Sequence, residues 1–142
     1  MKKSLHYLNM FLAGITLAGI TIYTNTSFAG DGKPEGKPWP CPDKEAKVKS
    51  PIKSDASVMT TGKELWNQHC KSCHGKTGKG DGTKAESINI SCGDFTSEKY
   101  QKRTDGELYW LTTEGRKPMP SYKEKLTDNE RWMIVLFTRT FK

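Results

Sequence analysis

The chain has 142 residues, of which 34% are hydrophobic and 27% charged, and its formal net charge is +7. This length allows one domain with a tail and excludes a large α/β enzyme. Sixteen hydrophobic residues fall within the first 29 positions, so the 113 residues that follow contain only 32, about 28%. We therefore expect something other than side chains to fill part of the interior.

The N-terminal segment has the layout of a secretory signal peptide. Lys2 and Lys3 precede an uncharged, largely apolar stretch over 8–23, which leads to small residues at 27–29. We expect residues 1–29 to be removed by cleavage, although the long apolar stretch would also suit an uncleaved membrane anchor. In both cases the rest of the chain is exported, into the periplasm or the equivalent compartment of a bacterium, where disulfides persist.

Residues 30–56 form a segment rich in proline and lysine. They contain five of the chain's seven prolines and few aliphatic residues. This composition predicts an extended or polyproline-like segment that does not fold alone. Trp39 and Cys41 interrupt the polar composition, so we expect part of the segment to dock onto the domain that follows, over residues 57–142.

Three helices are predicted within that domain, and no strand. Apolar residues at helical spacing predict a first helix that runs from about Ser57 into a cysteine motif. Capping boxes at 104–107 and 127–130 open the second and third helices, and Gly115 ends the second. The residues expected to face inward are Val58, Leu65, Trp66, Cys70, Cys73, Leu108, Leu111, Trp132, Met133, Leu136 and Phe137. The domain is therefore predicted to be all-α, with long loops between a few short helices.

The cysteine motif carries the chemistry. Residues 70–74 read Cys-Lys-Ser-Cys-His, the C-x-x-C-H pattern of c-type haem attachment. Two thiols one helical turn apart can form thioethers to the two vinyl groups of one porphyrin. The adjacent imidazole of His74 is thereby placed against the iron, so Cys70, Cys73 and His74 are the candidate haem-binding residues.

Other interpretations of these cysteines are possible. A thioredoxin-like dithiol needs a strand and a βαβ context, which the sequence does not contain. A zinc site could use all four cysteines, but Cys41 and Cys92 do not form a second short-spaced pair. A structural disulfide between Cys70 and Cys73 would leave His74 unexplained.

Further stretches match a known family, in order along the domain: Gly62 to Trp66, Cys70 to Gly75, Gly78 to Gly82, Asp94 to Thr96, Asp105 to Leu108, Met119 to Tyr122 and Glu130 to Trp132. On these stretches the chain resembles small monohaem bacterial cytochromes c of class I. The resemblance implies an all-α cytochrome c fold, with short helices and long loops around one covalently attached haem c. It also implies that the first and last helices cross near Gly62, Trp66 and Trp132.

A haem iron with one histidine needs a sixth ligand or an open site. Met59 lies before the haem motif, and Met133 lies in an amphipathic helix where packing is its default role. Met119 stands between Pro118 and Pro120, which stiffen the backbone. The family places its methionine ligand in this kind of loop, which makes Met119 the expected distal ligand; a surface-loop methionine is the alternative.

The partner of the proximal histidine is not evident. Related sequences usually carry a proline soon after the glycine loop, near a carbonyl that accepts the ring N–H of that histidine, but residues 83–92 contain none. An acceptor for His74 is still expected, because it orients the imidazole. His69 adjoins Cys70 and cannot reach the distal face, so we expect it to be exposed or hydrogen-bonded.

Two cysteines remain once the haem has taken its pair. In an exported protein, leftover thiols favour a disulfide. We expect Cys41 and Cys92 to form this bridge and to fix the proline-rich segment to the loop after the haem motif. Free or intermolecular thiols are the alternatives.

Basic residues flank both segments of the predicted haem edge: Lys71, Lys76, Lys79, Arg116, Lys117, Lys123 and Lys125. They are interpreted as a ring that steers redox partner proteins with an acidic docking surface, or else as an ordinary solvated surface. The basic residues do not form a stripe with stacking aromatics, so nucleic-acid binding is not indicated. Membrane contact is expected only if the N-terminal segment is uncleaved, and the protein is expected to be a monomer.

The leading hypothesis is an exported one-electron carrier, not an enzyme, that cycles a His/Met-ligated haem between Fe(III) and Fe(II). The alternative is a haem c subunit of a larger respiratory oxidoreductase complex. A gas-binding haem protein is less favoured, because cytochromes of the c′ type carry their haem motif near the C-terminus.

The low apolar content yields a first prediction. A porphyrin would supply apolar bulk to a domain of a size that often needs external staples. The protein produced without haem should therefore show no cooperative thermal transition by circular dichroism, whereas the haem-loaded protein should melt cooperatively. A compact apoprotein with a cooperative melt would contradict this expectation.

Overall fold

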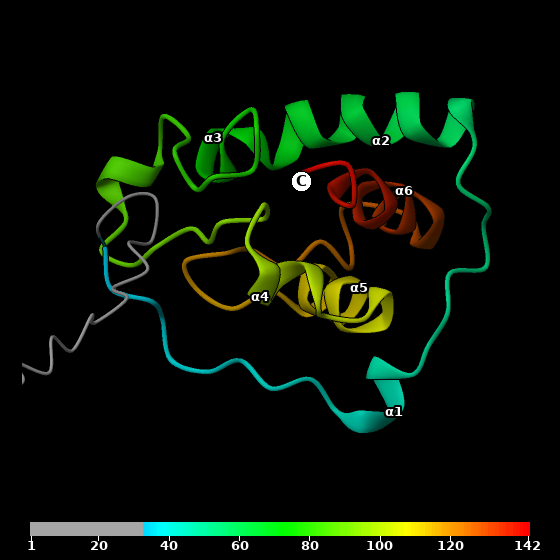
Figure 1. The fold of residues 1–142 in the computed structure, drawn as a ribbon, viewed down its shortest axis with the longest axis horizontal. Helices are drawn as coiled ribbons and strands as arrows, with labels where there is room; N and C mark the ends of the chain where they lie inside the picture. The colour runs from blue at the N-terminus through cyan, green and yellow to red at the C-terminus, as the bar shows by residue number, and fades with distance from the viewer. Residues whose placement is uncertain (1–32) are drawn as a thin grey trace, which may run out of the picture.

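The computed structural model describes residues 33–142, and the predicted signal peptide lies outside them (Figure 1). Within these residues the elements are α1 (Asp43–Ala46), α2 (Ala56–His69), α3 (Lys71–His74), the 3-10 turn η1 (Ala85–Ser87), α4 (Glu98–Gln101), α5 (Asp105–Glu114) and α6 (Asp128–Thr138). The described part of the chain contains no strand, and Arg116 and Met119 form an isolated bridge. The all-α prediction is confirmed.

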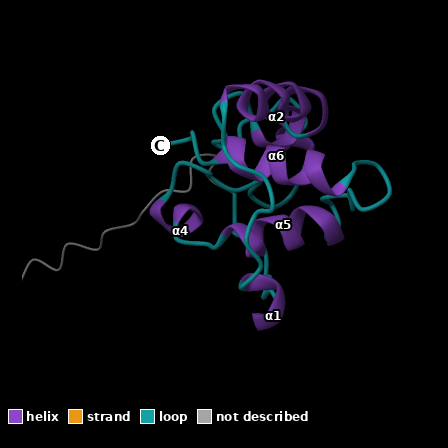
Figure 2. Ribbon diagram, turned by 90° about the vertical axis from the view of Figure 1, so that its right-hand side faces the viewer, coloured by secondary structure: helices purple, strands orange, loops and turns teal. Residues whose placement is uncertain are grey.

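Helices α2, α6 and α5 stack in succession, with α1 beyond α5 (Figure 2). At the crossing of α2 and α6, a Cβ atom on Gly62 would lie 2.4 Å from the carbonyl oxygen of Met133. The two backbones therefore approach more closely than any residue other than glycine permits. This confirms the expected crossing of the first and last helices at Gly62.

The helix ends follow the predicted capping. In α5 the backbone N–H of Thr104 donates to Glu107 Oε2 at 2.7 Å, and the N–H of Glu107 donates to Thr104 Oγ1 at 3.1 Å. Thr127 and Glu130 form the same reciprocal pair at the start of α6. Gly115 ends α5 with a φ of +62°, so both boxes and the terminator are confirmed.

The predicted apolar stripe of α6 is only partly right. Ile134 and Val135 are among its most buried residues, whereas Met133, Leu136 and Phe137 are half-buried. The reason is that α6 lies between α2 and α5 and is covered on two sides, which a single 3-4 stripe cannot express.

Trp132 adjoins Met133 at the α2–α6 crossing, but its side chain faces away from α2. Its ring stacks on Tyr109 of α5, with centroids 4.2 Å apart and planes within 9°. It belongs to a second core cluster with Leu108 and Val135, separate from the one that contains Trp66. The helices therefore cross near Trp132, as expected, although the Trp132 ring faces α5, the other neighbour of α6.

The proline-rich segment docks onto the domain, as predicted. It includes the short helix α1, which the sequence did not indicate. Thr104 Oγ1 donates to the Ala46 carbonyl at 2.6 Å, and Gly106 leaves room for the Glu45 carbonyl, which would lie 2.3 Å from a Cβ there. The segment is thus held against the start of α5 by contacts to its backbone.

Between the haem motif and α5 the sequence predicted irregular structure, and α4 and η1 were missed. Ser97 begins α4 by accepting a bond from the N–H of Tyr100 at 3.3 Å. Elements of three or four residues carry too few periodic positions to be detected. Among residues 33–142 we find no helix both long and apolar enough to cross a bilayer.

Replacing Gly62 by alanine should destabilise the protein. The added methyl group collides with the Met133 carbonyl, so α2 and α6 must separate, at a cost of about 1–3 kcal/mol in the free energy of unfolding. Denaturant titration of the haem-loaded protein measures this cost. The exposed neighbour Lys63→Ala is the control and should stay close to wild type; equal stability of both variants would contradict the close crossing.

Candidate haem-binding site

The cysteine motif lies at the junction of α2 and α3. The N–H of Cys70 donates to the carbonyl of Trp66, and the N–H of His74 donates to the carbonyl of Cys70, each at 2.9 Å. Cys70 is 7% exposed and lies in the core, whereas Cys73 is half-buried. This continuous helical path presents both thiols and the imidazole from consecutive turns.

The environment of Cys70 disfavours a redox dithiol. Burial, with a smaller contribution from the neighbouring Cys73, raises the pKa of the Cys70 thiol to about 12. A reactive cysteine needs the opposite, a lowered pKa that provides thiolate at neutral pH. In addition, residues 33–142 contain no cluster of three potential metal ligands among His, Cys, Asp and Glu, which argues against the zinc alternative.

The partner of His74 is the backbone carbonyl of Cys92, 2.7 Å from Nδ1. A carbonyl oxygen only accepts hydrogen bonds, so Nδ1 carries the proton and Nε2 keeps its lone pair. Burial also lowers the pKa of His74, which favours the neutral ring. The imidazole is thus in the tautomer and charge state of a metal ligand that coordinates through Nε2.

The glycine loop (residues 75–82) folds closely around α3. The N–H of Gly80 donates to the His74 carbonyl at 2.9 Å, and Trp66 Nε1 donates to the Gly75 carbonyl at 3.1 Å. A Cβ on Gly82 would lie 2.4 Å from the Ser72 carbonyl oxygen. The loop therefore needs glycine where it touches the haem motif, and it holds His74 through backbone bonds.

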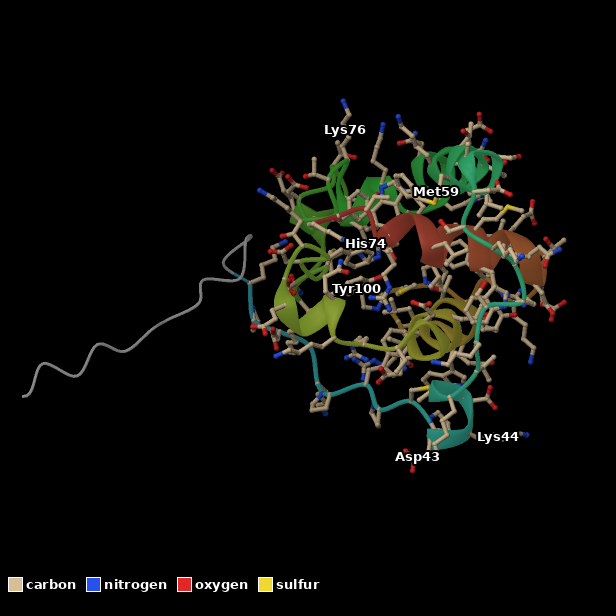
Figure 3. The ribbon with its side chains drawn as sticks, turned by 45° about the vertical axis from the view of Figure 1, so that its right-hand side comes forward. Asp43, Lys44, Met59, His74, Lys76 and Tyr100 are labelled. Carbon is tan, nitrogen blue, oxygen red and sulfur yellow. The ribbon has the colours of Figure 1, made fainter. Side chains whose placement is uncertain are left out.

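Aromatic rings surround His74. Its ring centroid lies 4.8 Å from that of Phe95 and 5.8 Å from that of Trp66. Phe95 in turn stacks on Tyr100 of α4, with centroids 4.1 Å apart. Figure 3 shows His74 and Tyr100 in the interior, whereas Lys76 points outward. The rings restrict the access of water to the proximal side of the site.

The three methionines occupy different environments. Met119 is half-buried and packs against the core cluster that contains Cys70. Met59 lies in the first turn of α2, at the opposite end of that helix from the haem motif, and Ser54 Oγ donates to its sulfur at 3.3 Å. Met133 packs within α6, at the helix crossing. Met119 is the methionine that a loop brings to the same core as the haem motif.

Tyr122 ties the methionine loop to the haem motif. Its hydroxyl donates to the carbonyl of His69 at 2.7 Å, immediately before Cys70. Nearby, Ser121 Oγ donates to the Thr113 carbonyl at 2.7 Å. His69 therefore contributes a backbone oxygen to the site, and its half-buried ring lies edge-on to Tyr122, with centroids 6.0 Å apart.

Arg131 is a buried charge that sequence reasoning missed. It is 4% exposed, and its guanidinium donates to the carbonyls of Tyr122, Lys123 and Leu126 at 3.3, 2.9 and 2.6 Å. Asp128 pairs with it. The Tyr122 carbonyl also accepts from the N–H of Leu126 at 3.1 Å, and the arginine bonds add to this turn and fix the segment after Met119.

The structure contains no bond between Cys41 and Cys92, which were expected to form a bridge. Cys41 lies near the start of α5, where burial and the charge of Glu107 raise the pKa of its thiol. Cys92 lies in the loop after the haem motif, where its carbonyl bonds to His74. The proline-rich segment docks in an orientation that carries Cys41 to a different part of the domain.

All seven residues of the predicted basic ring are exposed. Lys71, Lys76 and Lys79 are exposed, as are the lysines that follow Met119. The exposed guanidinium of Arg116 also donates to backbone carbonyls of the proline-rich segment.

An all-α domain with this helix crossing, a C-x-x-C-H motif and a histidine held in the Nε2-ligating form is a class I monohaem c-type cytochrome, and its cofactor is one covalently bound haem c. Residues 57–137 match the family model described as cytochrome c oxidase, cbb3-type, subunit III. This match covers more than half of the chain, which therefore belongs to that family.

Solved structures agree with this assignment. The chain is similar to a protein in the reducing HAO-like complex Kustc0457/Kustc0458 of Kuenenia stuttgartiensis, with 28% identity over 66% of this chain and a TM-score of 0.59. That match spans about half of the other protein, 49% of its length. The chain is also similar to the KustC0563 c-type cytochrome, with 34% identity, a TM-score of 0.50, and coverage of 57% of this chain and 96% of the other. No curated protein matches the sequence significantly.

Replacing Tyr122 by phenylalanine should destabilise the haem-loaded protein by about 1–2 kcal/mol, because the His69 carbonyl loses its donor. Denaturant titration at pH 7 measures this loss. The control is Thr83→Ser, a small change at an exposed position, which should leave the free energy of unfolding close to that of wild type.

The effect of Tyr122→Phe should also depend on pH. Burial raises the pKa of Tyr122 to about 12, above its ordinary value of 10. The phenol's contribution to stability is therefore complete below pH 10 and is lost as the pH rises from 10 to 12. The difference between wild type and variant should shrink over this interval, and a constant difference would contradict the raised pKa of Tyr122.

Proposed function

We propose that the protein is an exported one-electron carrier in which Cys70 and Cys73 attach the haem, His74 is the proximal iron ligand and Met119 is the distal one. The observation that carries this proposal is the bond from His74 Nδ1 to the Cys92 carbonyl, since it leaves Nε2 available for iron. When bound, the haem supplies the Fe(III)/Fe(II) couple, and a methionine thioether raises its reduction potential.

The residues of the chain then have distinct roles. The Cys92 carbonyl holds the Nδ1 proton of His74 and keeps the ring in one orientation. Trp66 and Phe95 cover the histidine and reduce the access of water. If His74 and Met119 both held the iron, a substrate would have no place on the metal, which favours electron transfer over catalysis.

The exposed lysines beside the haem motif, Lys71, Lys76 and Lys79, support docking onto acidic redox partners. The sequence pattern of residues 1–29 supports export to a bacterial periplasm. We expect the carrier to act as a monomer that meets its partners transiently.

A second candidate function is that of a haem c subunit in a larger respiratory complex. The family model that matches the chain is named after an oxidase subunit, and one similar structure comes from a multi-protein complex. Purification of the native protein under mild conditions distinguishes the two functions. A stoichiometric partner supports the subunit, and a protein that elutes alone at its monomer mass supports the carrier.

Replacing Met119 by alanine tests the distal ligand. The oxidised wild-type protein should show a weak absorption band at about 695 nm that the variant lacks, and the reduced variant, unlike the reduced wild type, should bind carbon monoxide at neutral pH. Met133→Leu and Met59→Leu are matched controls that should keep the band. A wild-type protein that is high-spin and binds carbon monoxide would defeat the carrier proposal.

A further inference from the structure

The strap (residues 33–40) lies outside the family match and contacts the loop that carries the acceptor of His74. Lys33 Nζ donates to the carbonyls of Ala85 and Ile88, the latter at 2.7 Å. The N–H of Ser91 donates to the carbonyl of Pro34 at 3.0 Å. One end of the strap is thus bonded to the chain just before Cys92.

The other end of the strap is held by Arg116. The guanidinium donates through Nη2 to the carbonyl of Lys37 at 2.8 Å and through Nη1 to the carbonyl of Pro38 at 3.0 Å. It also lies over the ring of Trp39, 4.7 Å from the centroid, and Trp39 packs edge-on against Trp110 of α5 at 6.4 Å. Two hydrogen bonds and one cation–π contact therefore fix the guanidinium of Arg116 on the strap.

Arg116 is also part of the turn that presents Met119. The N–H of Met119 donates to the carbonyl of Arg116 at 2.9 Å, and the two residues form the isolated bridge described above. The opposite end of this loop is fixed by Ser121 and Tyr122. The methionine turn (residues 116–119) is therefore anchored on one side by the bonds of Ser121 and Tyr122 and on the other by the side chain of Arg116.

We propose that Arg116 is a positioning residue for Met119, which uses the strap as a fixed support to keep the methionine turn in its ligating position. This inference rests on the proposed role of Met119 as the distal ligand. The planar guanidinium reaches two adjacent carbonyls and stacks on Trp39 at once, which the single ammonium of a lysine cannot do. Loss of this anchor should raise the fraction of molecules in which Met119 is away from the iron.

The experiment measures imidazole binding to the oxidised, haem-loaded protein, because imidazole can occupy the distal position only when the methionine has left it. Arg116→Ala and Arg116→Lys should both raise the imidazole affinity by about fivefold or more. Hydrogen exchange of the Met119 amide, which bonds to the Arg116 carbonyl, should accelerate in both variants.

Lys123→Ala is the matched control, since it removes one positive charge from the same loop on the other side of Met119. It should stay within about twofold of wild type. Equal affinities for wild type and Arg116→Ala would overturn the proposal. So would a wild-type affinity in Arg116→Lys, or an increase in Lys123→Ala as large as that in Arg116→Ala, because each would indicate an effect of charge alone.

Trp39→Ala removes the ring on which Arg116 stacks, and it is the second test if the Arg116 variants do not fold. It should raise the imidazole affinity in the same direction, and an unchanged affinity would count against the strap as a support. The proposed function is tested separately by the band at about 695 nm in the wild type. Its absence would defeat the assignment of Met119, whereas its presence with unaffected Arg116 variants would defeat only the positioning role.

Discussion

The hydrogen bond from His74 to the Cys92 carbonyl is the constraint on which the rest of the site depends. It joins the helical haem motif to a loop 18 residues further along the chain, and it fixes both the tautomer and the orientation of the imidazole. The glycine loop between them can fold only because its backbone approaches Ser72 and Asp81 at distances that a side chain would prevent. The backbone geometry of the glycine loop and the orientation of His74 therefore depend on each other.

The methionine side is organised by different means. The segment between α5 and α6 has no helix or strand to satisfy its carbonyls, and the chain has few apolar residues with which to bury it. Hydrogen bonds from side chains add to the two backbone turns of the segment, at 116–119 and 122–126. Arg131 donates to three carbonyls of the loop, and Tyr122 and Ser121 donate to carbonyls of neighbouring elements. A domain with a small apolar core can hold a long loop in place in this way, because two of the donors, Arg131 and Tyr122, are themselves buried.

The proline-rich segment extends the same principle to the surface. It forms no core of its own, yet its carbonyls accept bonds from Arg116 and Thr104, and Trp39 packs on Trp110. The segment connects the loop beside Cys92 with the turn that carries Met119. The sequence suggested that Arg116 helps to dock a partner protein. In the structure its guanidinium contacts the proline-rich segment.

The sequence by itself determined the helical class, the capped starts of α5 and α6, and the haem motif, because each depends on residues within a few positions of one another. Only the tertiary structure decided the acceptor of His74, the burial of Arg131 and the direction of Trp132. The bonding atoms in the first two cases are backbone carbonyls, which carry no sequence signal. The third depends on α6 having neighbours on two sides, and the separation of Cys41 from Cys92 depends on the path of a segment that has no periodic pattern. Contacts between distant parts of the chain produce no local sequence pattern, yet they hold the haem-binding residues in position.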